Sequence, residues 1–224
     1  MNQVTVPGTG ECFDLDRPGQ VAAWNRALNR RFGMQNLRAH PNRIVRWIEA
    51  RRRRRVAAMV PAGFDRAIDV GAEDGSLATL WRSKGRFTLL LDVDPGMLRD
   101  AAGAGAVADA VALPLADASV DVIVLSAVLE HLLEPERAVA ESLRVLRPGG
   151  RLVIYVPWDR AAIALKRWAR RIGVGLGKLS EGSAPGHLRT FDRRSLSRLL
   201  ANAGPDVRTS FDPFSLGYYA EVRR

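Results

Sequence analysis

Residues 67–81, AIDVGAEDGSLATLW, decide the expected fold. An apolar run containing Asp69 is followed by Gly71 and Gly75 and then by a helical pattern. Glycine is needed where a strand turns sharply at its carboxyl end, because a Cβ would obstruct the turn and an approaching ligand. The spacing is G-x-x-x-G, unlike the G-x-G-x-x-G of dinucleotide sites, and Asp74 at the expected helix start would repel a phosphate. The stretch predicts a strand–turn–helix unit for a ligand without phosphates, although a tight structural turn would use the same residues.

Apolar runs of the same kind recur along the chain and alternate with helical patterns. The further runs are residues 87–93, 106–109, 120–126 and 151–157, and the helical patterns are residues 75–84, 95–102, 128–146 and 159–171. Short runs that are apolar on both faces are typical of buried parallel strands. A helix at about 192–203 and strands near 206–211 and 217–223 follow. The order predicts an α/β fold with a doubly wound, Rossmann-like sheet.

The N-terminal part has a different pattern. Residues 1–17 are expected to form an irregular arm, and residues 18–31 a helix. A second helix is expected to begin after Pro41 and to include the arginines 51–55. We therefore divide the chain into a helical N-terminal extension or cap, 1–60, and a main domain, 61–224. Five successive arginines point to every side of a helix. A solvated helix end explains them better than a nucleic-acid patch, since no aromatic residues are interleaved.

The composition fits one globular unit. The chain has 224 residues, 47% of them hydrophobic, and a formal net charge of +10. These values exclude a disordered or coiled-coil chain. No apolar stretch reaches the length of a membrane span, no secretory signal is visible, and the single Cys12 fits a reducing compartment, so we expect a cytoplasmic protein. Lysine occurs only three times, and such an arginine bias often reflects a GC-rich genome, so the charge is weak evidence for nucleic acid.

Two further acids follow the later apolar runs. Asp92 ends the second run, 23 residues after Asp69, where an acid can accept both hydroxyls of a ribose. It could instead cap the following helix, but Asp94, directly before Pro95, is better placed as the N-cap. Asp109 ends the third run, where it could contact the edge of an adenine or be a solvated loop residue.

Together these segments resemble the class I S-adenosylmethionine-dependent methyltransferases of the small-molecule type. The resemblance is carried by IDVGAEDG (68–75), LLLDVDPGML (89–98), ADAVALPLADASVDVIVLSAVLEHLLEP (108–135) and LRVLRPGGRLVIYVP (143–157), and GHLRTFDRRSLSRLLANAG (186–204) extends it. It implies a seven-stranded sheet with an antiparallel last strand and S-adenosyl-L-methionine as cofactor. The cofactor-binding residues that it implies are Asp69, Gly71, Glu73 and Gly75 for the methionine part, Asp92 for the ribose, Asp109 and Ala110 for the adenine, Ser126 near the sulfonium, and also Val93. Glu73 departs from the family, which usually has glycine there.

The expected chemistry is methyl transfer to a small-molecule acceptor, at oxygen. A hydroxyl acceptor gains from a general base, and His131 and His187 are the candidate catalytic residues, although each could be a structural histidine. Glu130 beside His131 could join a metal site, but the sequence indicates no further ligand, so no metal is expected. The alternatives are an RNA or protein methyltransferase and a non-catalytic cofactor-binding module. The expected partner is the small-molecule acceptor; nucleic acid is not favoured, no membrane span is expected, and a homodimer is left open.

Overall fold

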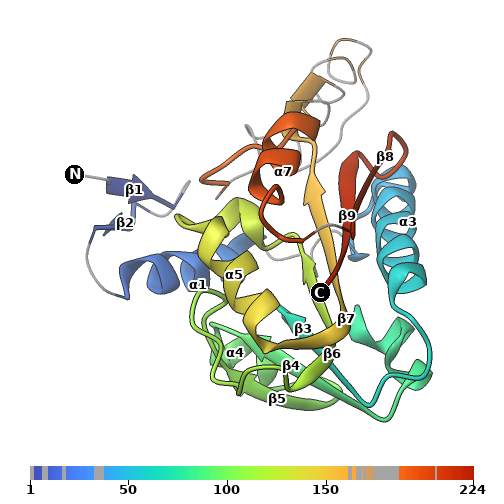
Figure 1. Ribbon diagram of the computed structural model, residues 1–224. Coiled ribbons are helices and arrows are strands. Elements are labelled where there is room, and N and C mark those ends of the chain that lie inside the picture. Colours follow the sequence, from blue (N-terminus) through green and yellow to red (C-terminus); the bar gives the residue numbers. More distant parts are fainter. Residues whose placement is uncertain are drawn as a thin grey trace.

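The protein is described from a computed structural model, shown in Figure 1. The structure describes residues 3–6, 10–16, 19–32, 38–160, 163–164, 168, 171, 173, 187–204 and 206–224. Within these residues, no helix combines the length and the apolar character needed to cross a membrane. Most of the expected helix at 159–171 lies outside the described residues.

A seven-stranded sheet forms the centre of the molecule. Its strands are β3 (Arg66–Val70), β4 (Phe87–Asp92), β5 (Ala104–Val107), β6 (Val120–Ser126), β7 (Leu146–Pro157), β8 (Asp206–Asp212) and β9 (Gly217–Arg223). They are arranged in the order β5-β4-β3-β6-β7-β9-β8. The neighbouring strands from β5 to β7 pair in parallel, whereas β9 pairs antiparallel with both β7 and β8. The expected Rossmann-like fold with an antiparallel last strand is confirmed.

Helices cover the sheet on both faces, because its central strands are apolar on both faces. On β6, Ile123 and Leu125 belong to one core, shared with α5 (Pro135–Val145) and α7 (Arg193–Leu199). The alternate residues Val122 and Val124 belong to the opposite core, shared with α3 (Arg43–Met59). Figure 1 shows α3 and α5 on opposite sides of β6 and β7. Alternation along one strand thus builds a three-layer molecule.

The prediction of a helix at residues 75–84 is wrong. This segment forms two 3₁₀ turns, η1 (Ala78–Leu80) and η2 (Arg82–Lys84). The Lys84 ammonium donates to the carbonyl oxygens of Ala57 at 2.7 Å and Val60 at 2.8 Å, at the carboxyl end of α3. Trp81 is fully buried against Phe64, with ring centroids 6.0 Å apart. These tertiary contacts override the local helical pattern.

Two other expected helices are shorter than the sequence indicated. The segment 128–146 begins as the 3₁₀ turn η3 (Leu129–His131), and α5 starts only at Pro135. Proline lacks an N–H and fits the first turn of a helix but not its interior. The helix expected at 95–102 is limited to α4 (Pro95–Leu98), whose N-cap is Asp94, as expected.

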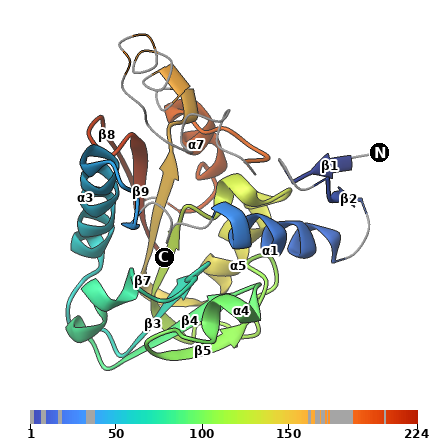
Figure 2. The ribbon, with the colours of Figure 1, turned by 180° about the vertical axis from the view of Figure 1, so that it is seen from behind.

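The N-terminal part is more regular than expected. The predicted irregular arm contains a hairpin of β1 (Gln3–Thr5) and β2 (Cys12–Asp14). With α1 (Gln20–Phe32) it builds a third, small core, against which Leu133 and Leu188 of the main domain pack. Figure 2 shows the hairpin and α1 on the side of the molecule away from α3. By contrast α3, which a boundary at residue 60 assigns to the extension, packs directly on the sheet.

Candidate active site

The glycine loop follows β3 at the carboxyl edge of the sheet. Gly71 and Gly75 have φ values of +71° and +69°, which favour glycine. A Cβ at Gly71 would lie 2.6 Å from Cγ2 of Val128, and a Cβ at Gly75 would lie 2.5 Å from Cδ1 of Leu90. Both glycines therefore have a packing reason in addition to the turn, since they let the loop pack closely on β4 and on the segment after β6.

Asp92 holds this loop from the end of β4. Its Oδ2 accepts the Glu73 N–H at 2.9 Å, and its Oδ1 accepts the Asp94 N–H at 2.9 Å. Burial raises the pKa of Asp92, and the two backbone N–H groups oppose that shift. Glu73 itself has a left-handed φ of +49°. Because each carboxylate oxygen has two lone pairs, Asp92 can still accept hydrogen bonds from a ligand.

Asp69 is the most unusual acid of this edge. Its carboxyl is buried in β3, and its Oδ2 has no hydrogen-bond partner among the described residues. Burial raises the pKa of Asp69 to about 7; Arg52 opposes this, whereas Asp92 and Glu73 add to it. A cationic group of a ligand would satisfy this oxygen and stabilise its charge.

Arg52 and Glu49 are site residues that the sequence did not single out. Both lie in α3 and are buried, with exposed fractions of 5% and 4%. Arg52 donates to both Glu49 oxygens, from Nε at 2.8 Å and from an Nη at 2.7 Å, and its other Nη donates to Ser126 Oγ at 2.6 Å. Burial alone would lower the pKa of Arg52, but the charge and hydrogen bonds of Glu49 raise it on balance. Glu49 is the single acid in this arginine-rich helix, and this was the sequence signal that could have indicated an ion pair.

The remaining expected cofactor residues lie beyond β4 and β5. Val93 is half-buried after β4, and Ala110 is buried in the main core. Asp109 is exposed, and its Oδ1 accepts the Val111 N–H at 3.1 Å. The structure thus brings Asp69, Asp92 and the glycine loop together, whereas Asp109 belongs to a separate turn.

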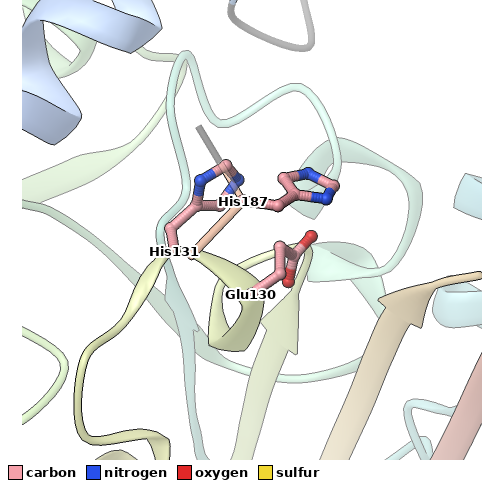
Figure 3. A group of neighbouring side chains, drawn as sticks. All are labelled: Glu130, His131 and His187. Carbon is pink, nitrogen blue, oxygen red and sulfur yellow. The ribbon is translucent and has the colours of Figure 1, made fainter. Parts of the chain in front are cut away.

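His131 and His187 come together although 56 positions separate them in the sequence. Their ring centroids are 4.9 Å apart in an edge-to-face arrangement, beside Glu130 (Figure 3). The Glu130 carbonyl oxygen accepts the N–H groups of Leu188 at 2.8 Å and Arg189 at 3.2 Å, which holds the segment after His187 against η3. His187 Nδ1 lies 2.9 Å from Oδ1 of the buried Asp159.

Glu130 is the second buried acid of the site with an unusual environment. Its side chain is 1% exposed, and neither carboxylate oxygen has a hydrogen-bond partner among the described residues. Burial raises the pKa of Glu130 to about 7, His187 opposes that shift, and Asp159 adds to it. The turn η3 begins shortly after β6 ends at Ser126, so His131 lies at the same carboxyl edge of the sheet as the glycine loop. His187 lies there too, because its ring contacts that of His131.

Comparison with known proteins now adds to this geometry. Residues 68–154 match the family model described as a methyltransferase domain. Over these residues the chain is similar to a class I S-adenosylmethionine-dependent methyltransferase domain. The matched residues include the glycine loop, Asp92 and the Glu130–His131 pair.

Proteins of similar sequence agree with this resemblance. The demethylmenaquinone methyltransferase of Clavibacter sepedonicus is 32% identical over 146 residues, which are 62% of this chain and 58% of that protein. The chain thus spans less than two thirds of that relative's length.

Solved structures show the same fold. A Thermotoga maritima protein, described as a possible histamine N-methyltransferase, superposes with a TM-score of 0.63 at 21% identity, covering 88% of this chain and 98% of that one. The N-methyltransferase NodS of Bradyrhizobium japonicum, solved with S-adenosylhomocysteine, gives a TM-score of 0.57 at 16% identity, covering 90% and 96%.

Proposed function

We propose that this protein transfers a methyl group from S-adenosylmethionine to an oxygen atom of a small-molecule acceptor. The observation that carries the proposal is Asp69, a buried carboxylate with an orphaned oxygen beside a glycine loop at the carboxyl edge of a class I methyltransferase sheet. The cofactor's methionine part has a cationic amino group that fits this oxygen. When bound, the cofactor supplies a methyl carbon whose bond to sulfur breaks, leaving the electron pair on sulfur, as the acceptor oxygen bonds to that carbon.

The protein's own residues would bind and align the two reactants. We assign Asp69 and the loop residues Gly71, Glu73 and Gly75 to the methionine part. The remaining cofactor contacts are assigned to Asp92 and Val93 for the ribose, Asp109 and Ala110 for the adenine, and Ser126 near the sulfonium. The free lone pairs of Asp92 support its role. Alignment of an activated donor with its acceptor supplies most of the rate enhancement in such a displacement.

His131 and His187 are proposed as the candidate general bases that accept the proton of the acceptor hydroxyl. The contact between Asp159 and His187 Nδ1 favours His187 as the general base, because a carboxylate fixes the tautomer and orientation of the imidazole. His187 would take the hydroxyl proton as the new oxygen–carbon bond forms. The side chain of Asn25 in α1 donates to the His131 carbonyl oxygen at 3.5 Å, which supports a role of the N-terminal extension as a roof over the acceptor.

The surroundings of the arginine run favour a small acceptor over RNA or an acidic protein. Arg52 is buried, and Arg51 and Arg55 both pair with Asp212, at 2.9 and 3.2 Å. Arg53 donates to the carbonyl oxygen of Ser76. Most of the run is therefore engaged in holding α3 on the sheet and the glycine loop, which leaves less free charge for a polyanion.

Calorimetric titration with S-adenosylhomocysteine tests the cofactor part of the proposal. We expect the wild type to bind with micromolar or tighter affinity and Asp92→Ala to bind at least about tenfold more weakly, because a hydrogen bond to a charged group contributes about 1.5–3 kcal/mol. Asp100→Ala, which removes an exposed acid between β4 and β5, is the control and should bind like the wild type. A folded wild type that does not bind would leave a non-catalytic scaffold.

Turnover needs a separate measurement. Labelled S-adenosylmethionine, incubated with a panel of hydroxylated small molecules, should give O-methylated products with the wild type. His187→Gln should lower kcat and leave S-adenosylhomocysteine affinity unchanged, since the base acts only in the chemical step. Equal turnover by His187→Gln would exclude this residue as the base.

A further inference from the structure

Glu130, His131 and His187 form a group that we call the Glu–His–His cluster. Each residue offers one ligand atom, and these three atoms lie within 4.8 Å of one another. Figure 3 shows the two imidazoles next to each other with the Glu130 carboxylate beside them. Imidazole nitrogens and carboxylate oxygens around a common centre are the usual donor set of transition-metal sites.

The Glu130 carboxylate lacks a partner that its burial requires. It is 1% exposed, and both of its oxygens are without a hydrogen-bond partner within the part of the chain that the structure describes. Buried charges in proteins are normally paired, hydrogen-bonded or coordinated to a metal. A cation at the centre of the cluster would satisfy this carboxylate.

Asp159 gives the cluster a second feature of metal sites. It contacts His187 Nδ1 at 2.9 Å, and a carboxylate in this position orients a metal-ligating imidazole and increases its basicity. In such an arrangement the ligand atom of His187 would be its other ring nitrogen, Nε2. A divalent cation at the centre of the cluster would balance the charge of the buried Glu130 and Asp159 carboxylates in their ionised form.

We propose that the Glu–His–His cluster binds a divalent transition-metal ion such as Zn²⁺, with Asp159 orienting His187. Small side-chain rotations would bring the three ligand atoms to bonding distance of one centre. Two nitrogens and one oxygen suit Zn²⁺ or Co²⁺ better than Ca²⁺ or Mg²⁺, which prefer oxygen ligands. Three protein ligands leave a coordination position open, as in catalytic zinc sites.

The metal site deepens the proposed function. Binding of the ion does not depend on that function, but its role in the reaction, given next, rests on it. An acceptor hydroxyl on the open position would lose its proton to water, because a bound cation lowers the pKa of a coordinated hydroxyl. In the metal-bound form the imidazoles would act as ligands, whereas in the metal-free form His187 would be the base, as proposed above. The acceptor would accordingly be a hydroxylated molecule that can coordinate the ion.

Metal binding can be measured without any turnover. The untagged full chain, stripped with a chelator, is titrated with ZnCl₂ in a calorimeter and with CoCl₂ in an absorption spectrometer. We expect one site with a Kd of about 1 µM or tighter and a visible Co²⁺ spectrum. Glu130→Gln, His131→Gln and His187→Gln should each weaken Zn²⁺ binding at least about tenfold, and Asp159→Asn by about 10–100-fold.

Two variants control for binding elsewhere. His40→Gln removes the third histidine, whose Nδ1 accepts the Asn42 N–H, and Cys12→Ser removes the exposed thiol. Both should keep the Zn²⁺ affinity of the wild type. Unchanged binding of S-adenosylhomocysteine by the cluster variants would show that they are folded.

The possible results separate the two proposals. No stoichiometric Zn²⁺ binding by the wild type, or wild-type affinity in every cluster variant, would refute the metal site even if S-adenosylhomocysteine binds. Such a result with intact turnover would restore His187 as a metal-free base. Zn²⁺ binding that depends on the cluster, in a protein that does not bind S-adenosylhomocysteine, would support the metal site and refute the methyltransferase proposal.

Discussion

Asp69 has a buried carboxyl whose proton affinity differs between the folded and the unfolded chain. Its pKa is raised from 3.8 to about 7 by burial. The charged groups that affect it come from three elements: Arg52 on α3, Asp92 on β4 and Glu73 in the glycine loop. Because the folded state binds the proton more tightly, the stability that this group contributes is fully present below about pH 4. It is lost as the pH rises through 7.

Asp69→Asn should therefore stabilise the ligand-free protein at high pH. The neutral amide removes a buried charge, so at pH 8.5 we expect a gain of at least about 1 kcal/mol, or about 2–4 °C in Tm for a chain of this size. At pH 5.5, where the carboxyl is mostly protonated, the two proteins should differ much less. Thermal unfolding at the two pH values measures this.

The same substitution should weaken S-adenosylhomocysteine binding at least about tenfold, because the ligand's amino group loses a charged partner. Asp100→Asn, at an exposed position, should change neither property. If Asp69→Asn had the same effect on Tm at both pH values, the carboxyl would not change its protonation on folding.

At the scale of elements, α3 is attached to the sheet through buried charges. Arg52 joins Glu49 on its own helix to Ser126 at the end of β6, and its guanidinium lies 5.2 Å from the centre of the Tyr155 ring. Removing one partner of such a pair leaves the other charge buried and uncompensated. The pair thus links the position of α3 to the carboxyl edge of the sheet.

A double-mutant cycle on Glu49 and Arg52 tests this attachment. Arg52→Gln should lower the free energy of unfolding by about 3–5 kcal/mol, and the double variant Glu49→Gln/Arg52→Gln should lose less, because it leaves no buried charge. Arg54→Gln is the matched control; this residue is exposed on the same helix and should change stability by at most about 0.5 kcal/mol. Urea unfolding measures the two single variants Glu49→Gln and Arg52→Gln, the double variant and the control. A double variant that is the least stable would contradict the argument.

The elements also show how far the sequence allows prediction. The glycine loop and Asp92 could be placed at the carboxyl edge of the sheet because their signals are local, a strand followed by turn residues. The role of Arg52 could not be predicted, since a run of five arginines gives no indication of which one is buried. The cluster of Glu130 with His187 depends on a tertiary contact across 57 positions. The turns after Gly75 are set by Lys84 and Trp81, which contact residues far from the local pattern.

At the scale of the whole molecule, the three cores differ greatly in size. The two cores that flank the sheet share the strands β3, β4, β6, β7 and β9. Among the residues that the structure describes, the buried members of the third core are Val6, Leu15, Trp24, Ala27 and Leu28. Regions with few buried apolar contacts open at lower free energy than the centre of a domain. The hairpin and α1, which we propose as a roof over the acceptor, are therefore expected to open most easily.

Hydrogen exchange under native conditions should reveal this order. We expect the amides of α1 to exchange by a local opening, well before those of β6, whose seven residues are all buried and whose amides should require global unfolding. Helix α5, which packs on the main core, is the matched helical control and should exchange with the sheet. Mass spectrometry of peptides from the three elements gives the rates. Equal protection of α1 and β6 would mean that the extension unfolds only with the whole domain, and an acceptor would then need another route to His131 and His187.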